Sequence, residues 1–69
     1  MYALSLRKAD HVRHYSVCAA SVGWEVKLEE DVTLRRLEHY RDWHRVERVI
    51  ALFEREAKAL MDSGWRLEE

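Results

Sequence analysis

The chain contains no proline, two glycines and a single cysteine among its 69 residues. The lone Cys18 excludes a disulfide within the chain and fits a reducing compartment. The two glycines, Gly23 and Gly64, are too few for a glycine-rich phosphate-binding loop. Apolar residues make up 48% of the sequence, and this content together with the lack of proline argues against a disordered chain.

An excess of charge of one sign is also lacking, because 12 Lys and Arg face 13 Asp and Glu. The near balance removes the strong overall field of a nucleic-acid or membrane-surface binder, although it leaves room for local patches. The apolar runs are only a few residues long, so nothing spans a bilayer, and no apolar segment follows Arg7 and Lys8 as a signal peptide requires. We therefore expect a cytoplasmic protein with no membrane partner.

One long amphipathic helix is the clearest pattern that is present. Apolar side chains recur at spacings of three and four residues between Trp43 and Leu60. Asp42 precedes this run as an N-cap, and Gly64 follows it as a left-handed residue at the C-terminal end. The helix is therefore predicted over 42–63.

Upstream of this helix the apolar period changes to two, which is typical of strands. Trp24, Val26 and Leu28 alternate with charged residues, as in a half-buried strand. A weaker alternation over 15–20 indicates an earlier strand. Residues 1–11 form either an edge strand or a loose N-terminal segment.

The segment 32–40 has two interpretations. Its β-branched start, Val32-Thr33, favours a strand that returns from the preceding turn. Leu34 and Leu37 are three residues apart, however, which suits a helix and would extend it over 33–62.

We reject the continuous helix because its apolar stripe, extended backward from Trp43, would contain His39 and Arg36. A strand with a β-bulge at Arg35-Arg36 would instead allow both leucines to face inward. The turn before this strand lacks an Asn-Gly or Asp-Gly pair, so the register of the hairpin stays open.

These elements predict one domain over 1–69, of the α+β class with the order β-β-β-α. A small antiparallel three-stranded meander occupies 12–40, and the long C-terminal helix packs on one of its faces. The layout resembles that of small uncharacterised bacterial domains in which a Gly-Trp-x-Val strand, here Gly23, Trp24 and Val26, precedes a hairpin and an Asp-capped helix. The resemblance implies a fold and no chemistry.

The four histidines and Cys18 give no pattern typical of a metal or catalytic site. His11 and His14 point to opposite faces if their segment is extended, so they do not chelate together. No Ser-His-Asp spacing appears, and a chain this short rarely encloses a substrate pocket. We therefore expect a protein that is not an enzyme and has no cofactor and no metal.

Arginines gather around the start of the predicted helix. Arg41, Arg45 and Arg48 lie where the helix macrodipole disfavours cations, so we expect each to pair with nearby acids or with a partner chain. The alternative is a nucleic-acid accessory protein in which these three arginines are anion contacts, joined by Arg35 and Arg36 along an arginine-rich edge.

Self-association is the function that the pattern favours most. A strand of about seven residues covers ~24 Å, whereas the helix of about twenty residues covers ~30 Å. About one helical turn would therefore overhang the sheet. We expect a non-enzymatic protein–protein interaction module that forms a homodimer, with Val49, Leu52 and Glu56 as its interface at one border of the apolar stripe.

Overall fold

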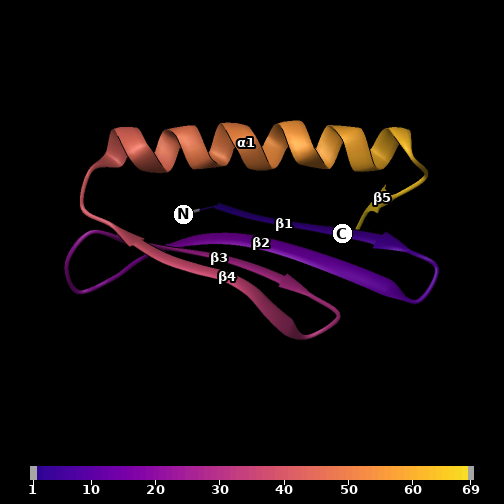
Figure 1. The fold of residues 1–69 in the computed structure, drawn as a ribbon, viewed down its shortest axis with the longest axis horizontal. Helices are drawn as coiled ribbons and strands as arrows, with labels where there is room; N and C mark the ends of the chain where they lie inside the picture. Colours follow the sequence, from indigo (N-terminus) through magenta and orange to yellow (C-terminus); the bar gives the residue numbers. More distant parts are fainter. Residues whose placement is uncertain (1, 69) are drawn as a thin grey trace.

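Four antiparallel strands follow one another in a meander, and a short fifth strand completes the sheet (Figure 1). The structure, a computed structural model, describes residues 2–68. The order across the sheet is β4-β3-β2-β1-β5. The α+β class with one C-terminal helix is confirmed, whereas the expected count of three strands is wrong. The elements are β1 (Tyr2–Lys8), β2 (His11–Ala19), β3 (Trp24–Glu30), β4 (Thr33–Tyr40), α1 (Trp43–Asp62) and β5 (Arg66–Leu67).

The two additional strands lie near the ends of the chain. The alternation of Tyr2, Leu4 and Leu6 forms β1, and its turn into β2 occupies only Ala9 and Asp10. Leu6 is fully buried, so this segment belongs to the core rather than to a loose tail. β5 has only two residues, too few for any periodic signal in the sequence.

Helix α1 begins and ends where the sequence predicts. The Asp42 carboxylate accepts a hydrogen bond of 3.0 Å from the His44 backbone N–H. At the other end Gly64 has a φ of 104°, and the Trp65 backbone N–H donates to the Leu60 carbonyl at 3.0 Å. This is a Schellman motif, and it reverses the chain so that β5 pairs with β1.

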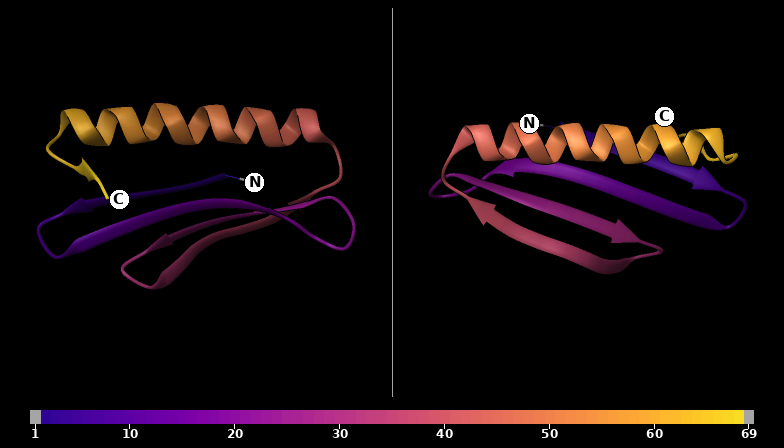
Figure 2. Two further views of the ribbon diagram at one scale, coloured as in Figure 1. Left: turned by 180° about the vertical axis from the view of Figure 1, so that it is seen from behind. Right: turned by 45° about the horizontal axis from the view of Figure 1, so that its top comes forward.

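The core lies between α1 and one face of the sheet, and the opposite face has no helix over it (Figure 2). The rings of Tyr15 and Phe53 meet at its centre with 4.7 Å between their centroids and 51° between their planes. The buried side chains come from every element except β4 and β5. They are Leu6, Tyr15, Val17, Val26, Leu28, Val46, Val49, Phe53 and Ala57.

The sheet is as long as the helix. β2 has nine residues and runs beneath the length of α1 in Figure 1. Nine residues of strand cover ~30 Å, the same as twenty residues of helix. The overhang expected from the sequence is therefore wrong, because it rested on a strand that was too short.

The predicted bulge in β4 is confirmed, but the direction of its leucines is wrong. The β3–β4 register shifts beside Arg35. Leu34 pairs with Glu29 and Leu37 with Lys27, on the sheet face away from α1. The bulge does bring both leucines to one face, yet they are 51% and 47% exposed there.

The positions of β4 that share the helix side of the sheet hold polar residues. Arg36 pairs with Leu28, and Glu38 pairs with Val26, both of which belong to the core. Tyr40 follows on the same side and is half-buried against the core. β4 therefore forms the margin of the core.

A strained two-residue turn joins β3 to β4. Asp31 and Val32 have φ values of 51° and 61°, the left-handed backbone of a type I′ turn. A β-branched residue rarely adopts this conformation, and Val32 is 98% exposed, so no contact of its side chain compensates. The Asp31 carboxylate holds the turn, because it accepts a hydrogen bond of 2.9 Å from the Val12 backbone N–H and lies 2.9 Å from Nδ1 of His11.

Replacing Val32 with Gly should relieve this strain. We expect Val32→Gly to raise the free energy of unfolding by about 1 kcal/mol, because the left-handed region costs an L side chain more than glycine loses in unfolded-state entropy. Urea denaturation followed by tryptophan fluorescence measures the change. Val22→Gly is the matched control, since Val22 is also exposed but has a negative φ, and it should destabilise slightly. A loss of stability in Val32→Gly would contradict the left-handed turn.

Candidate functional site

A groove of about 380 Å³ runs between β4 and the neighbouring flank of α1. Phe53 lies beneath it, and the Arg36 side chain reaches over the ring with its guanidinium carbon 5.9 Å from the centroid. The groove thus combines an apolar floor with charged walls. The helix contributes Leu52, Arg55, Glu56 and Ala59 to its lining.

The groove exists because one helix is narrower than the sheet. An α-helix is ~10 Å across, so it covers about two strands spaced ~4.8 Å apart. The buried sheet residues beneath α1 come from β1, β2 and β3. β4 lies to one side of the helix, as the right-hand view of Figure 2 shows. Leu52, Glu56 and Ala59 are spaced four and three residues apart, so they share the helix flank that faces this uncovered strip.

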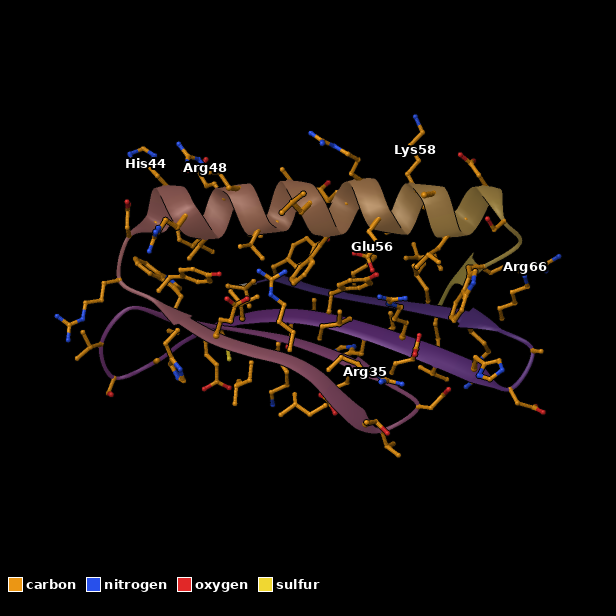
Figure 3. The ribbon with its side chains drawn as sticks, in the orientation of Figure 1. Arg35, His44, Arg48, Glu56, Lys58 and Arg66 are labelled. Carbon is orange, nitrogen blue, oxygen red and sulfur yellow. The ribbon has the colours of Figure 1, made fainter. Side chains whose placement is uncertain are left out.

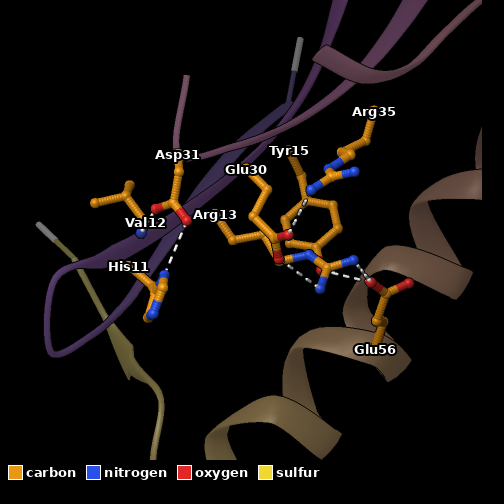
Figure 4. A network of polar contacts seen from close by, with 8 residues as sticks. All are labelled: His11, Val12, Arg13, Tyr15, Glu30, Asp31, Arg35 and Glu56. Atoms are coloured by element: carbon orange, nitrogen blue, oxygen red, sulfur yellow. Dashed lines mark hydrogen bonds and ion pairs between the residues drawn. The ribbon is translucent and has the colours of Figure 1, made fainter. Parts of the chain in front are cut away.

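Glu56 connects the helix flank to the sheet (Figure 4). Its Oε1 accepts hydrogen bonds from the Arg13 guanidinium and from the Tyr15 hydroxyl, the latter at 2.9 Å. Arg13 also contacts the Glu30 carboxylate at 3.4 Å, and Arg35 reaches Glu30 at 3.5 Å. This network joins β2, β3 and β4 to α1 at the edge of the core.

Burial raises the pKa of the Tyr15 hydroxyl, and the hydrogen bond to the Glu56 carboxylate raises it further, although the charge of Arg13 opposes both effects. The Tyr15 hydroxyl therefore stays protonated and donates its hydrogen bond well above neutral pH. The Nε of Arg13 is buried with no hydrogen-bond partner in residues 2–68, while its two other nitrogens are paired.

An ion pair lies along the helix side of β4. The Arg36 guanidinium donates to the Glu38 carboxylate. This hydrogen bond, and a weaker one from Tyr40, lower the pKa of Glu38. The two charged side chains are 36% and 40% exposed. Both charges are therefore present and accessible at the outer edge of the sheet.

The structure separates the three residues of the interface expected on the helix. Val49 is 5% exposed and belongs to the core. Glu56 is held by Arg13 and Tyr15. Leu52 is 50% exposed beside the groove, so it is the apolar member of the three that a partner can reach.

The arginines of the expected edge divide into two groups. The two in β4, Arg35 and Arg36, pair with acids of the same sheet. The second group is Arg41, Arg45 and Arg48. All three are exposed, and no ion pair within residues 2–68 involves them, so the expected pairing with acids of this chain is not found there. In Figure 3, Arg48 points away from the sheet.

The opposite face of the sheet carries a larger cavity, of about 580 Å³, that the sequence did not predict. The Ser5 Oγ and the His14 Nδ1 lie 2.6 Å apart at its wall, and Glu29 is the register partner of His14. Within the described chain no hydrogen bond joins His14 to Glu29, so His14 lacks the carboxylate contact that orients a catalytic histidine. Ser5, His14 and Glu29 lie in one row across β1, β2 and β3. The sequence could not predict this row, because it did not decide whether residues 1–11 form a strand.

Comparison of the chain with models of protein families, with curated proteins and with solved structures gave no match. In the part of the chain that the structure describes, no group of three or more His, Cys, Asp or Glu side chains is placed to hold a metal ion. The single long helix of residues 2–68 is not apolar enough to cross a bilayer. Function is therefore inferred from the groove and the sheet edge beside it.

The hydrogen bond between Tyr15 and Glu56 should appear as a coupling free energy. We expect Tyr15→Phe to cost about 1 kcal/mol of stability in the natural chain, and less than about half of that in a Glu56→Ala background, where the acceptor is already missing. Urea denaturation of the four chains measures the cycle. Glu54→Ala, on the other helix flank, serves as the control background. In that background Tyr15→Phe should lower the free energy of unfolding by the same amount as in the natural chain. Equal costs in all three backgrounds would contradict the network.

Proposed function

We propose that the chain is a protein–protein interaction module that self-associates through its β4 side, defined as the free edge of β4 with the groove above it. The observation that carries the proposal is the placement of three exposed leucines around this strand. Leu52 lies on the helix side, and Leu34 and Leu37 lie on the opposite face; they are 50%, 51% and 47% exposed. Apolar surface gathered in this way is typical of an interface.

The free edge of β4 supports the same proposal. β3 pairs with one side of β4, and no strand of residues 2–68 lies on its other side. An unpaired edge presents N–H and C=O groups that a second strand can bind. A two-fold pairing of this edge covers apolar side chains on both faces of the sheet at once. A contact between helices alone would bury less apolar surface, because Val49 is already in the core and Glu56 is hydrogen-bonded to Tyr15 of the sheet.

Sedimentation tests the proposal directly. We expect the protein to be a dimer at micromolar concentration, and Leu52→Lys to raise the dimer dissociation constant by about tenfold or more, because it places a charge where apolar area would be buried. Leu67→Lys is the control, since Leu67 has the same 50% exposure but lies in β5 at the other edge. A monomer up to millimolar concentration would contradict self-association. An unchanged dimer in Leu52→Lys would place the interface on another face.

A second candidate function is nucleic-acid binding at the start of α1. The observation that favours it is that Arg41, Arg45 and Arg48 are exposed and have no ion pair within residues 2–68. Three cations without acidic partners at one end of a helix are suited to phosphate contacts.

The salt dependence of binding tests this second candidate. With three phosphate contacts, the affinity for labelled duplex DNA should fall by about fortyfold between 50 and 200 mM salt. Substitution of the three arginines by Gln should remove this dependence in fluorescence anisotropy. The same change at Arg7, Lys8 and Arg66, at the far end of the sheet, should leave it intact. Binding that both triple variants weaken equally would contradict this location.

A further inference from the structure

Strand β4 carries opposite charges on either side of Leu37. Arg36 and Glu38 are two residues apart, so they share the helix side of the sheet, whereas Leu37 faces the other way. A second copy related by a two-fold axis at Leu37 would run antiparallel to the first. Each Arg36 would then lie directly opposite the partner's Glu38, at the separation where cross-strand pairs interact.

We infer that two copies of this chain join their β4 strands in the antiparallel register centred on Leu37, so that the Arg36–Glu38 contact is made twice across the two-fold axis. The inference rests on the proposed self-association and names the surface that makes it. The occupant of the free edge is a second copy because the edge is complementary to itself.

Charge excludes the neighbouring registers. A register centred on Arg36 places two arginines opposite each other, and one centred on Glu38 places two glutamates opposite each other, both of which destabilise a strand pair. The bulge at Arg35 limits regular pairing to the residues after it. A register centred on His39 places Arg36 opposite position 42, beyond the end of β4, so the contact between Arg36 and the partner's Glu38 is not formed.

The same register also places the apolar surface consistently. Because opposed residues share a face, both α1 helices lie on one side of the joined sheet, and the two grooves beside Leu52 become neighbours. On the other side Leu37 meets the partner's Leu37, which covers a side chain that is 47% exposed in the single chain. Registers that slip by one residue would place the two helices on opposite faces and leave the grooves apart.

A charge exchange between two variants tests the register. Arg36→Glu and Glu38→Arg each place like charges opposite each other at both contacts, so each variant alone should raise the dimer dissociation constant by about tenfold or more. An equimolar mixture restores opposite charges at both contacts and should form a heterodimer with a dissociation constant within about threefold of the natural one. Sedimentation measures the affinities, native mass spectrometry identifies the heterodimer, and far-UV circular dichroism verifies that both variants are folded.

The other edge of the sheet offers a matched control. Arg7 and Glu68 form an ion pair there at 2.6 Å. Arg7→Glu and Glu68→Arg should leave the dimer unchanged. A natural chain that is monomeric would overturn both the self-association and the register. A natural dimer that neither β4 variant weakens, or weakened variants that do not recover when mixed, would overturn the register alone and leave the self-association standing.

Oxidative crosslinking tests the register without any change of charge. In a Cys18→Ser background, Leu37→Cys should give a disulfide-linked dimer, because the two cysteines face each other across the axis within disulfide distance. Leu34→Cys in the same background should not crosslink, since it lies beyond the bulge and away from the axis. Crosslinking at position 34 but not at 37 would overturn the register.

Discussion

The width of α1 relative to the sheet is the constraint on which the rest of the structure depends. A helix ~10 Å across covers about two strands, and the meander supplies four that are ~4.8 Å apart. The buried residues come from α1 and from the three strands β1, β2 and β3, and none of them comes from β4. At the positions of β4 that share the helix side, an apolar residue would stay wet, and the chain has Arg36 and Glu38 there. The groove is the space that this mismatch leaves.

Polar contacts replace apolar packing where the core ends. Glu56 leaves the helix at the border of the apolar stripe and meets Arg13 and Tyr15 of β2, while Glu30 extends the contacts toward β4. The side chains are partly exposed, so water screens their charges and each ion pair adds little to stability. Together they link the helix flank to β4 through β2 and β3. Arg36, which packs over Phe53, belongs to both the core margin and the outer edge.

The features that the sequence predicted correctly are those set by local signals. The Asp42 cap, the Gly64 reversal and the alternation after Gly23 each act within a few residues, and all three are found in the structure. The side on which Leu34 and Leu37 lie depends instead on how β4 registers with β3, which no short segment encodes. The turn that sets this register is made by Asp31 and Val32, and turn rules disfavour a β-branched residue such as Val32 at a positive φ.

The candidate site could be predicted only in part for the same reason. The helical wheel isolates Leu52, because its position depends on the helix alone. The groove needs a partner wall from β4, and the Ser5–His14 contact needs the β1–β2 pairing, so both are properties of the assembled sheet. The helical wheel places Val49 and Glu56 at the border of the stripe, but it does not predict that Val49 is buried in the core or that Glu56 is held by Arg13 and Tyr15, because both depend on how the helix docks on the sheet.

The short strand β5 limits the free backbone at the β1 edge of the sheet. It pairs with Leu6 and Arg7 of β1, and the Glu68 backbone N–H donates to the Ser5 carbonyl at 2.8 Å. The outer side of β1 is thereby occupied at Ser5, Leu6 and Arg7, in the second half of the strand, whereas no strand of residues 2–68 lies along the outer side of β4. Growth of a fibre by strand addition needs an open edge at both ends of every added unit. Because β5 has two residues and covers only part of β1, this edge offers an added strand fewer consecutive backbone groups than β4 does, which disfavours polymerisation by strand addition.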